Sequence, residues 1–92
     1  MAMSLEKKRL EIDNIDQRVV ELLSRRAELA LEVGKEKQAG GMDLKDNARE
    51  DDVLRRIRKL NQGPLCDDAV ASIYHRIISA CLELQQQGEG KH

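Results

Sequence analysis

The sequence predicts an all-α protein with three consecutive helices, the first of them very long. Apolar residues recur in alternating steps of three and four along the chain, and clusters of glycine, proline and aspartate interrupt this spacing at two places. Charged residues make up 36% of the chain and aromatic residues 1%, so leucine, isoleucine, valine and alanine must build the core. We find no alternating pattern of the kind that predicts a β-strand.

The first helix is predicted to begin after Ser4, a good N-cap, and to end at Gly40-Gly41. One face of this helix forms an apolar seam, which consists of Ile12, Ile15, Val19, Leu22, Leu29 and Val33. Arg26 and Lys37 occupy seam positions where apolar residues are expected. Gly34 costs up to about 1 kcal/mol relative to alanine inside a helix, so it predicts close approach by another helix or a ligand.

Two shorter helices are predicted to follow. The second begins after Asp43 or Asp46 and ends at residues 61–64, and its apolar stripe consists of Val53, Leu54, Ile57 and Leu60. Asp67 and Asp68 are expected to cap the third helix and to place negative charge at its start. Its apolar stripe consists of Val70, Ile73, Tyr74, Ile77, Ile78, Cys81 and Leu82. The polar end is expected to fray from Gln85 onward, with residues 88–92 as a flexible tail of a single domain, 1–92.

The length of the first helix predicts a homodimer. A helix of roughly 36 residues is about 54 Å long, whereas a compact domain of this size has a radius of gyration near 12 Å, estimated from chain length. One chain cannot cover such a helix, so a second copy is expected to bury its seam. Arg9 lies about 25 Å along the helix from Arg26 and roughly 100° off that face. If Arg9 serves the same site, it must come from the partner subunit.

Composition argues against several classes of protein. The net charge is −1 and a single aromatic residue is present, which disfavours a nucleic-acid-binding surface. The two cysteines, Cys66 and Cys81, and the two histidines, His75 and His92, show no metal-ligand spacing, so no metal is expected. No apolar run has the length of a membrane span, and we expect a cytoplasmic protein that does not contact a membrane.

Arg26 and Lys37 predict a binding site for an anion. They are three helical turns apart, about 16 Å along the axis, and point the same way. Burying unpaired cations is costly, so either acidic side chains of the fold or an anionic ligand must compensate their charge.

The other helices also carry polar residues on their apolar faces. Asp46 and Glu50 extend the stripe of the second helix, Arg49 lies one turn before Val53, and Gln85 extends the third helix. Together with Arg9, this set is cationic and contains no catalytic Cys–His or Ser–His arrangement. Because arginine forks suit carboxylates, a small dicarboxylate matches the charge of the site.

The chain contains a series of short sequence segments whose order and spacing are informative together. They are Arg9, Ile15-Asp16 with Leu22-Leu23, Arg25-Arg26, the run from Glu32 to Lys37, the run from Asp46 to Glu50, and Gln85. Each is weak alone, but together they resemble the all-helical class of chorismate mutases over roughly residues 5–87. The resemblance implies an intertwined dimer of three-helix chains with two equivalent sites, each completed by an arginine from the partner's first helix. It also implies conversion of chorismate to prephenate in phenylalanine and tyrosine biosynthesis, with no cofactor.

The resemblance assigns a role to each site residue. Arg9 of the partner chain and Arg26 are expected to clamp the two substrate carboxylates, and Lys37 and Gln85 to donate hydrogen bonds to the ether oxygen. The remaining residues are expected around the ring: Glu50 and the backbone near Asp46 hold the ring hydroxyl, with Arg49 nearby, and Cys81 replaces the serine common in relatives. Because a thiol is a poorer donor, we expect Cys81 to weaken substrate binding modestly.

Alternative interpretations of these residues remain open. Arg26 could pair with a carboxylate across a coiled coil, Lys37 could complement the helix dipole, and Gln85 could be a surface residue of a polar tail. An isochorismate pyruvate lyase of similar fold would use comparable cations, and a non-catalytic helical dimerisation domain would need no ligand. The sequence also leaves open whether this chain is a whole protein or one domain of a fusion enzyme.

Overall fold

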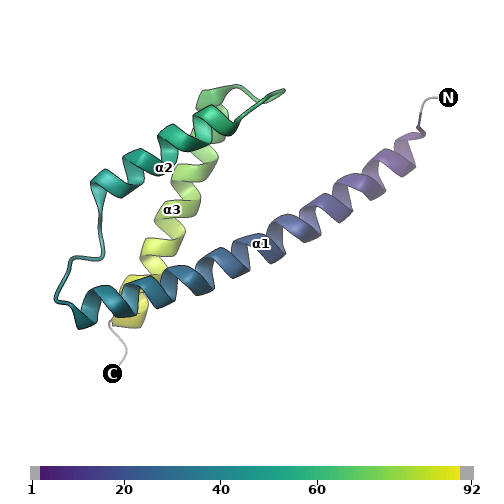
Figure 1. The fold of residues 1–92 in the computed structure, drawn as a ribbon. Coiled ribbons are helices and arrows are strands. Elements are labelled where there is room, and N and C mark those ends of the chain that lie inside the picture. The colour runs from purple at the N-terminus through teal and green to yellow at the C-terminus, as the bar shows by residue number, and fades with distance from the viewer. Residues whose placement is uncertain (1–2, 90–92) are drawn as a thin grey trace.

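The computed structural model describes residues 3–89 and contains three α-helices and no strand in that range (Figure 1). The helices are α1 (Leu5–Ala39), α2 (Asn47–Leu60) and α3 (Asp67–Glu89). The all-α prediction, the order of the helices and the great length of the first are therefore confirmed.

The helix starts follow from side-chain capping. The Ser4 hydroxyl accepts a hydrogen bond from the backbone N–H of Lys7 at 3.2 Å, which satisfies a free donor at the start of α1. Asp46 does the same for α2, where its Oδ1 accepts from the N–H of Arg49 at 3.0 Å. At the end of α1 the chain turns through Gly41, whose φ of 68° favours glycine. The predicted starts after Ser4 and Asp46 are confirmed.

The start of α3 differs in detail from the prediction. Asp67 lies inside the first turn of α3 and therefore does not cap it from outside. Instead, Asp67 accepts a hydrogen bond from the side chain of Asn61 at 2.8 Å, and Asp68 accepts one from Arg58 at 2.7 Å. The two carboxylates thus tie the end of α2 to the start of α3.

The C-terminal part of α3 is longer than the sequence indicated. The helix continues through Gly88 to Glu89, so the polar end is helical where the sequence predicted that it frays from Gln85. The physical reason is packing on α1, where the Gln85 side chain bonds to the backbone carbonyl of Ala30. The flexibility of segment 88–92 stays a prediction. Residues 90–92 lie outside the described residues.

Helix α3 organises the packing, because it contacts both α1 and α2, while α1 and α2 do not pack on each other within residues 3–89. The small buried core consists of Val53, Ile57 and Ala71, with Gly34 buried on α1. Figure 1 shows α3 against the C-terminal part of α1, while the N-terminal half of α1 extends away from the other helices. Only half of the long helix is therefore covered by its own chain.

The dimensions of the chain show that it is elongated. It measures 59 × 28 × 14 Å with a radius of gyration of 16.8 Å, against about 12 Å for a compact domain of this length. Its accessible surface is 7625 Å², against about 5,400 Å² for a compact monomer of this mass. Much of the excess lies on the seam of α1, where Ile12, Ile15, Val19 and Leu22 are all exposed.

Within the described part of the chain, no helix combines the length and apolar character needed to cross a lipid bilayer.

Candidate active site

A cavity of about 310 Å³ lies where α3 meets the C-terminal half of α1, the segment before α2 and the first turns of α2. Its volume is at the lower end of the range for small-molecule sites. The predicted site residues that line it are Arg26, Lys37, Asp46, Arg49, Glu50, Cys81 and Gln85. The structure thus brings together every predicted site residue except Arg9.

Arg9 lies outside this cavity. It is exposed near the N-terminal end of α1, about 25 Å along the helix axis from Arg26 by the rise of an α-helix. Because α1 is a single continuous helix, the Arg9 of one chain cannot reach the cavity of that chain.

Arg26 is held by two side chains of α3. Its Nη1 donates to the Cys81 sulfur at 3.3 Å, and its guanidinium carbon lies 6.0 Å from the centre of the Tyr74 ring, within cation–π range. Within residues 3–89 no carboxylate forms an ion pair with Arg26. Since a guanidinium has five N–H donors, most of them remain available to an anion in the cavity.

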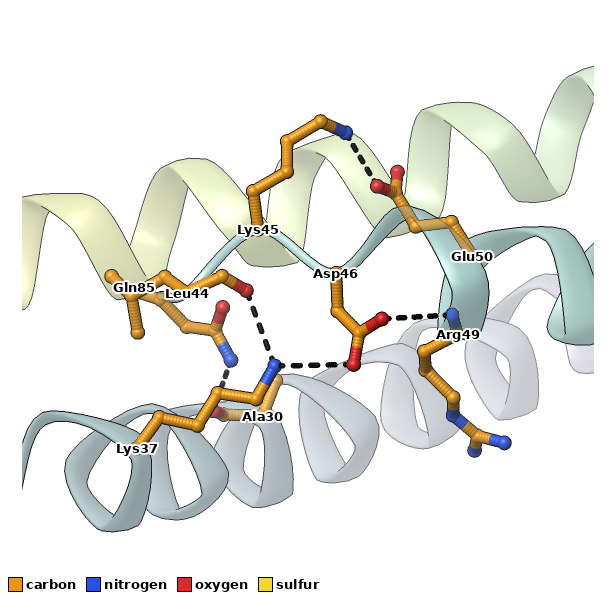
Figure 2. A network of polar contacts seen from close by, with 8 residues as sticks. All are labelled: Ala30, Lys37, Leu44, Lys45, Asp46, Arg49, Glu50 and Gln85. Carbon is orange, nitrogen blue, oxygen red and sulfur yellow. Dashed lines mark hydrogen bonds and ion pairs between the residues drawn. The ribbon is translucent and has the colours of Figure 1, made fainter. Parts of the chain in front are cut away.

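Lys37 joins the end of α1 to the segment before α2. Its Nζ donates to the backbone carbonyl of Leu44 at 3.3 Å and lies 3.9 Å from Oδ2 of Asp46 (Figure 2). The Lys37 side chain is 18% exposed. A lysine ammonium has three donors, so Lys37 can also bond to a ligand while it keeps these contacts.

Gln85 lies directly over Gly34. Its Nε2 donates to the carbonyl of Ala30 at 2.6 Å, and a Cβ built on Gly34 would lie 3.0 Å from the Gln85 Cγ. The prediction that Gly34 marks a close approach is confirmed, and the approaching element is α3. Because the bond to Ala30 places the amide nitrogen on the α1 side, the second N–H of Gln85 remains as a donor to a ligand.

Two cations of the cavity wall, Lys45 and Arg56, were missed by the sequence analysis. Lys45 forms an ion pair with Glu50, whereas Arg56 has no ion-pair partner within residues 3–89. Helical spacing was a usable signal for Arg56, which lies two turns after Arg49 on the same face of α2. No comparable signal existed for Lys45, because it precedes the helix.

The electrostatics of the cavity favour an anionic ligand. Its lining contains five cations, Arg26, Lys37, Lys45, Arg49 and Arg56, and two carboxylates, Asp46 and Glu50. Leu29, Val33, Ile78 and Leu82 supply an apolar part of the wall. Within the described chain no group of histidine, cysteine and acidic residues is arranged to hold a metal ion. The donors can orient a small anionic molecule and stabilise negative charge that develops on it.

Fold and cavity together define an all-helical domain with a predominantly cationic cavity. The model of one family, chorismate mutase type II, matches residues 8–86, and the chain belongs to this family.

Two known bifunctional proteins are similar to this chain in sequence. The bifunctional chorismate mutase/prephenate dehydratase of Stutzerimonas stutzeri is 37% identical over 90 residues, which cover 92% of this chain and 25% of that protein. The protein of the same name from Neisseria gonorrhoeae is 40% identical over 75 residues, covering 82% and 20% of the two chains. The chain thus spans about a quarter or less of the length of these relatives.

A solved structure supports the fold. The form II structure of chorismate mutase from Thermus thermophilus superimposes with a TM-score of 0.88 at 28% sequence identity. The match covers 89% of this chain and 93% of the other. The predicted three-helix fold of the all-helical chorismate mutases is confirmed.

Proposed function

We propose that this chain converts chorismate to prephenate. The observation that carries the proposal is one cavity, in a member of the chorismate mutase type II family, that gathers Arg26, Lys37, Glu50 and Gln85. The rearrangement takes place within one molecule and needs no nucleophile, metal or cofactor. An enzyme accelerates it by holding the compact conformer and by stabilising the charge that grows on the ether oxygen as its C–O bond breaks.

Lys37 and Gln85 are the proposed donors to the ether oxygen. Both line the cavity beside α1, and each keeps an unused N–H after its contacts within the protein. A charged and a neutral donor at one oxygen stabilise negative charge in the transition state more than in the substrate, which is the requirement for catalysis.

The remaining cavity residues are assigned to the substrate's periphery. Arg26 binds one carboxylate with its free guanidinium donors, and Glu50 accepts a hydrogen bond from the ring hydroxyl. The backbone near Asp46 supports the same hydroxyl, and Arg49 balances the charge. Cys81 lies beside Arg26 and contributes weakly, because a thiol is a poor donor.

The second substrate carboxylate is assigned to Arg9 of a partner subunit in a homodimer. The exposed seam of α1, the excess surface and the position of Arg9 outside its own cavity support this assignment. An intertwined pair would bury the seam and complete both sites at once. The cytoplasmic location expected from the sequence also stays a prediction, which cell fractionation checks.

The test is an assay of purified protein with chorismate, following the loss of its diene absorbance and identifying prephenate by its conversion to phenylpyruvate in acid. We expect enzymatic turnover, with kcat/KM lowered at least about 100-fold in Arg26→Ala because a charge-binding donor is lost. Arg25→Ala is the matched control, since Arg25 is exposed and pairs with Glu28 on the same helix.

Absence of turnover would contradict the proposal. Turnover of isochorismate instead would identify a lyase. Failure with both substrates, with no dianion raising the melting temperature, would identify a helical dimerisation domain.

A further inference from the structure

Lys45 has no role in the proposed chemistry, although it lines the cavity. It immediately precedes Asp46, the N-cap of α2, and its ammonium forms an ion pair with Oε2 of Glu50. Figure 2 shows the Lys45 side chain reaching over the start of α2 to the Glu50 carboxylate. Among the hydrogen bonds within residues 3–89, this contact is the one that holds the Glu50 carboxylate.

We propose that Lys45 is a positioning residue for the reaction: it holds the Glu50 carboxylate so that the other oxygen accepts the substrate's hydroxyl. This inference rests on the proposed chorismate mutase function. It extends that function by giving a role to a residue that touches Glu50 and not the reacting atoms.

The start of α2 explains why these side chains meet. Asp46 caps the helix, so Lys45 precedes the cap and Glu50 lies four residues after it. Side chains at these two positions contact each other across a helix start, commonly as an apolar pair. In this chain the contact is ionic. The cap bond from Asp46 to the N–H of Arg49 fixes the direction from which Lys45 arrives.

The side chains of Glu50 and Lys45 differ in exposure, which indicates that they have different roles. The Glu50 side chain is 15% exposed and belongs to the cavity wall, whereas the Lys45 side chain is 53% exposed and covers Glu50 from outside. Because Lys45 occupies Oε2, Oε1 keeps its lone pairs for a ligand. Without Lys45, no contact within the described chain fixes the rotation of this carboxylate.

A double-mutant cycle tests the role. Lys45→Met keeps a long side chain at the helix start but removes the charge, and Glu50→Gln removes the negative charge with which Lys45 pairs. For Lys45→Met we expect KM to rise roughly three- to tenfold, the equivalent of one net hydrogen bond, with kcat little changed. Lys45→Arg should restore KM. In the Glu50→Gln background, Lys45→Met should add no further loss.

Lys59→Met serves as the control for lost positive charge, since Lys59 is an exposed residue of α2 outside the cavity lining. An unchanged KM in Lys45→Met would overturn the inference. So would an equal loss in the Glu50→Gln background, which indicates that Lys45 steers the substrate independently. A lowered KM would show that Lys45 competes with the substrate for Glu50.

The wild-type chain separates the two levels of inference. If it turns over chorismate and Lys45→Met behaves like wild type, only the role of Lys45 fails. If the wild-type chain itself does not turn over chorismate, the proposed function fails and the role of Lys45 fails with it.

Discussion

The bond from Gln85 to the Ala30 carbonyl fixes the rotation of the Gln85 amide. A carbonyl oxygen accepts but cannot donate, so it selects the NH₂ end of Gln85 and excludes the amide oxygen. The backbone of α1 therefore orients a donor carried by α3. This orientation comes from a helix carbonyl, whose position no side-chain substitution on α1 alters directly.

Replacing Gln85 by glutamate should restrict activity to acidic solution. The wild-type amide needs no proton to donate, so we expect kcat to change little from mildly acidic to neutral pH. In Gln85→Glu the carboxyl must be protonated to donate to the ether oxygen, and activity should fall as pH rises. Rate–pH profiles of both enzymes check this, with Gln87→Glu on the exposed side of α3 as control. A Gln85→Glu enzyme equally active at both pH values would remove Gln85 from this role.

Replacing the sulfur of Cys81 by the oxygen of serine is expected to improve substrate binding. Its sulfur accepts a hydrogen bond from Arg26, and a serine hydroxyl at this position could accept that bond and also donate to the substrate. We expect Cys81→Ser to lower KM by about threefold with kcat unchanged, the effect of one modest hydrogen bond. Steady-state kinetics measure it, and Cys66→Ser is the control because Cys66 is exposed outside the cavity. An increase in KM would show that the thiol is the better neighbour for Arg26.

At the scale of the helices, the crossing of α1 and α3 depends on Gly34. The atom nearest to a Cβ added at this position is the Cγ of Gln85, at 3.0 Å, and the Cβ and Cδ of Gln85 follow at 3.4 Å. These contacts involve the Cβ of Gln85, next to the backbone, as well as Cγ and Cδ further along the side chain. Any side chain on Gly34 therefore displaces the Gln85 amide relative to Ala30.

Gly34→Ala should separate stability from activity. Alanine favours the helix by about 1 kcal/mol over glycine, which offsets the strain against Gln85, so the melting temperature should change by only a few degrees. In contrast, kcat should fall at least about tenfold, because a donor displaced by a fraction of an ångström no longer fits the transition state.

Calorimetry and steady-state kinetics on the same protein give both quantities. Gly40→Ala is the control, since Gly40 has a negative φ and lies outside the cavity lining. An active Gly34→Ala enzyme would show that α3 can withdraw without losing the geometry of Gln85.

At the scale of the whole molecule, the proposed exchange of Arg9 between subunits has a quantitative consequence. Arg9→Ala and Arg26→Ala chains should each be inactive alone. In a hybrid dimer, the cavity of the Arg9→Ala chain keeps its own Arg26 and receives an intact Arg9 from the partner. With random pairing at equal amounts, half of the dimers are hybrids with one complete site, so about a quarter of wild-type activity should return.

Mixing after partial unfolding and refolding, followed by a chorismate assay, provides the measurement. If Arg9 acted within its own chain, hybrid dimers would contain no complete site and no activity would return. Sedimentation of the wild-type chain supplies the accompanying test, since a monomer at micromolar concentration would contradict the proposed dimer.

The elements and most of the cavity residues were predictable, because the signals that specify them are local. Capping by Ser4 and Asp46 and the spacing of apolar residues act within a few positions along the chain. Arg26 and Lys37 were identified because a charge at a seam position is visible in that same spacing. Lys45 was missed because it belongs to a connecting segment, where no periodicity indicates the direction of a side chain.

The sequence by itself determined three helices, their order, the excess length of α1 and the cationic character of the site, since propensity, capping and hydrophobic periodicity are written into neighbouring residues. Only the tertiary structure decided that Gln85 bonds to Ala30, that Arg26 lies between Cys81 and Tyr74, and that α3 remains helical to Glu89. The contacts of Gln85 and Arg26 join residues far apart in the chain, and the packing of α3 on α1 keeps the end of α3 helical. The geometry of these contacts depends on how closely two helices approach, a distance that packing sets and that no local pattern contains.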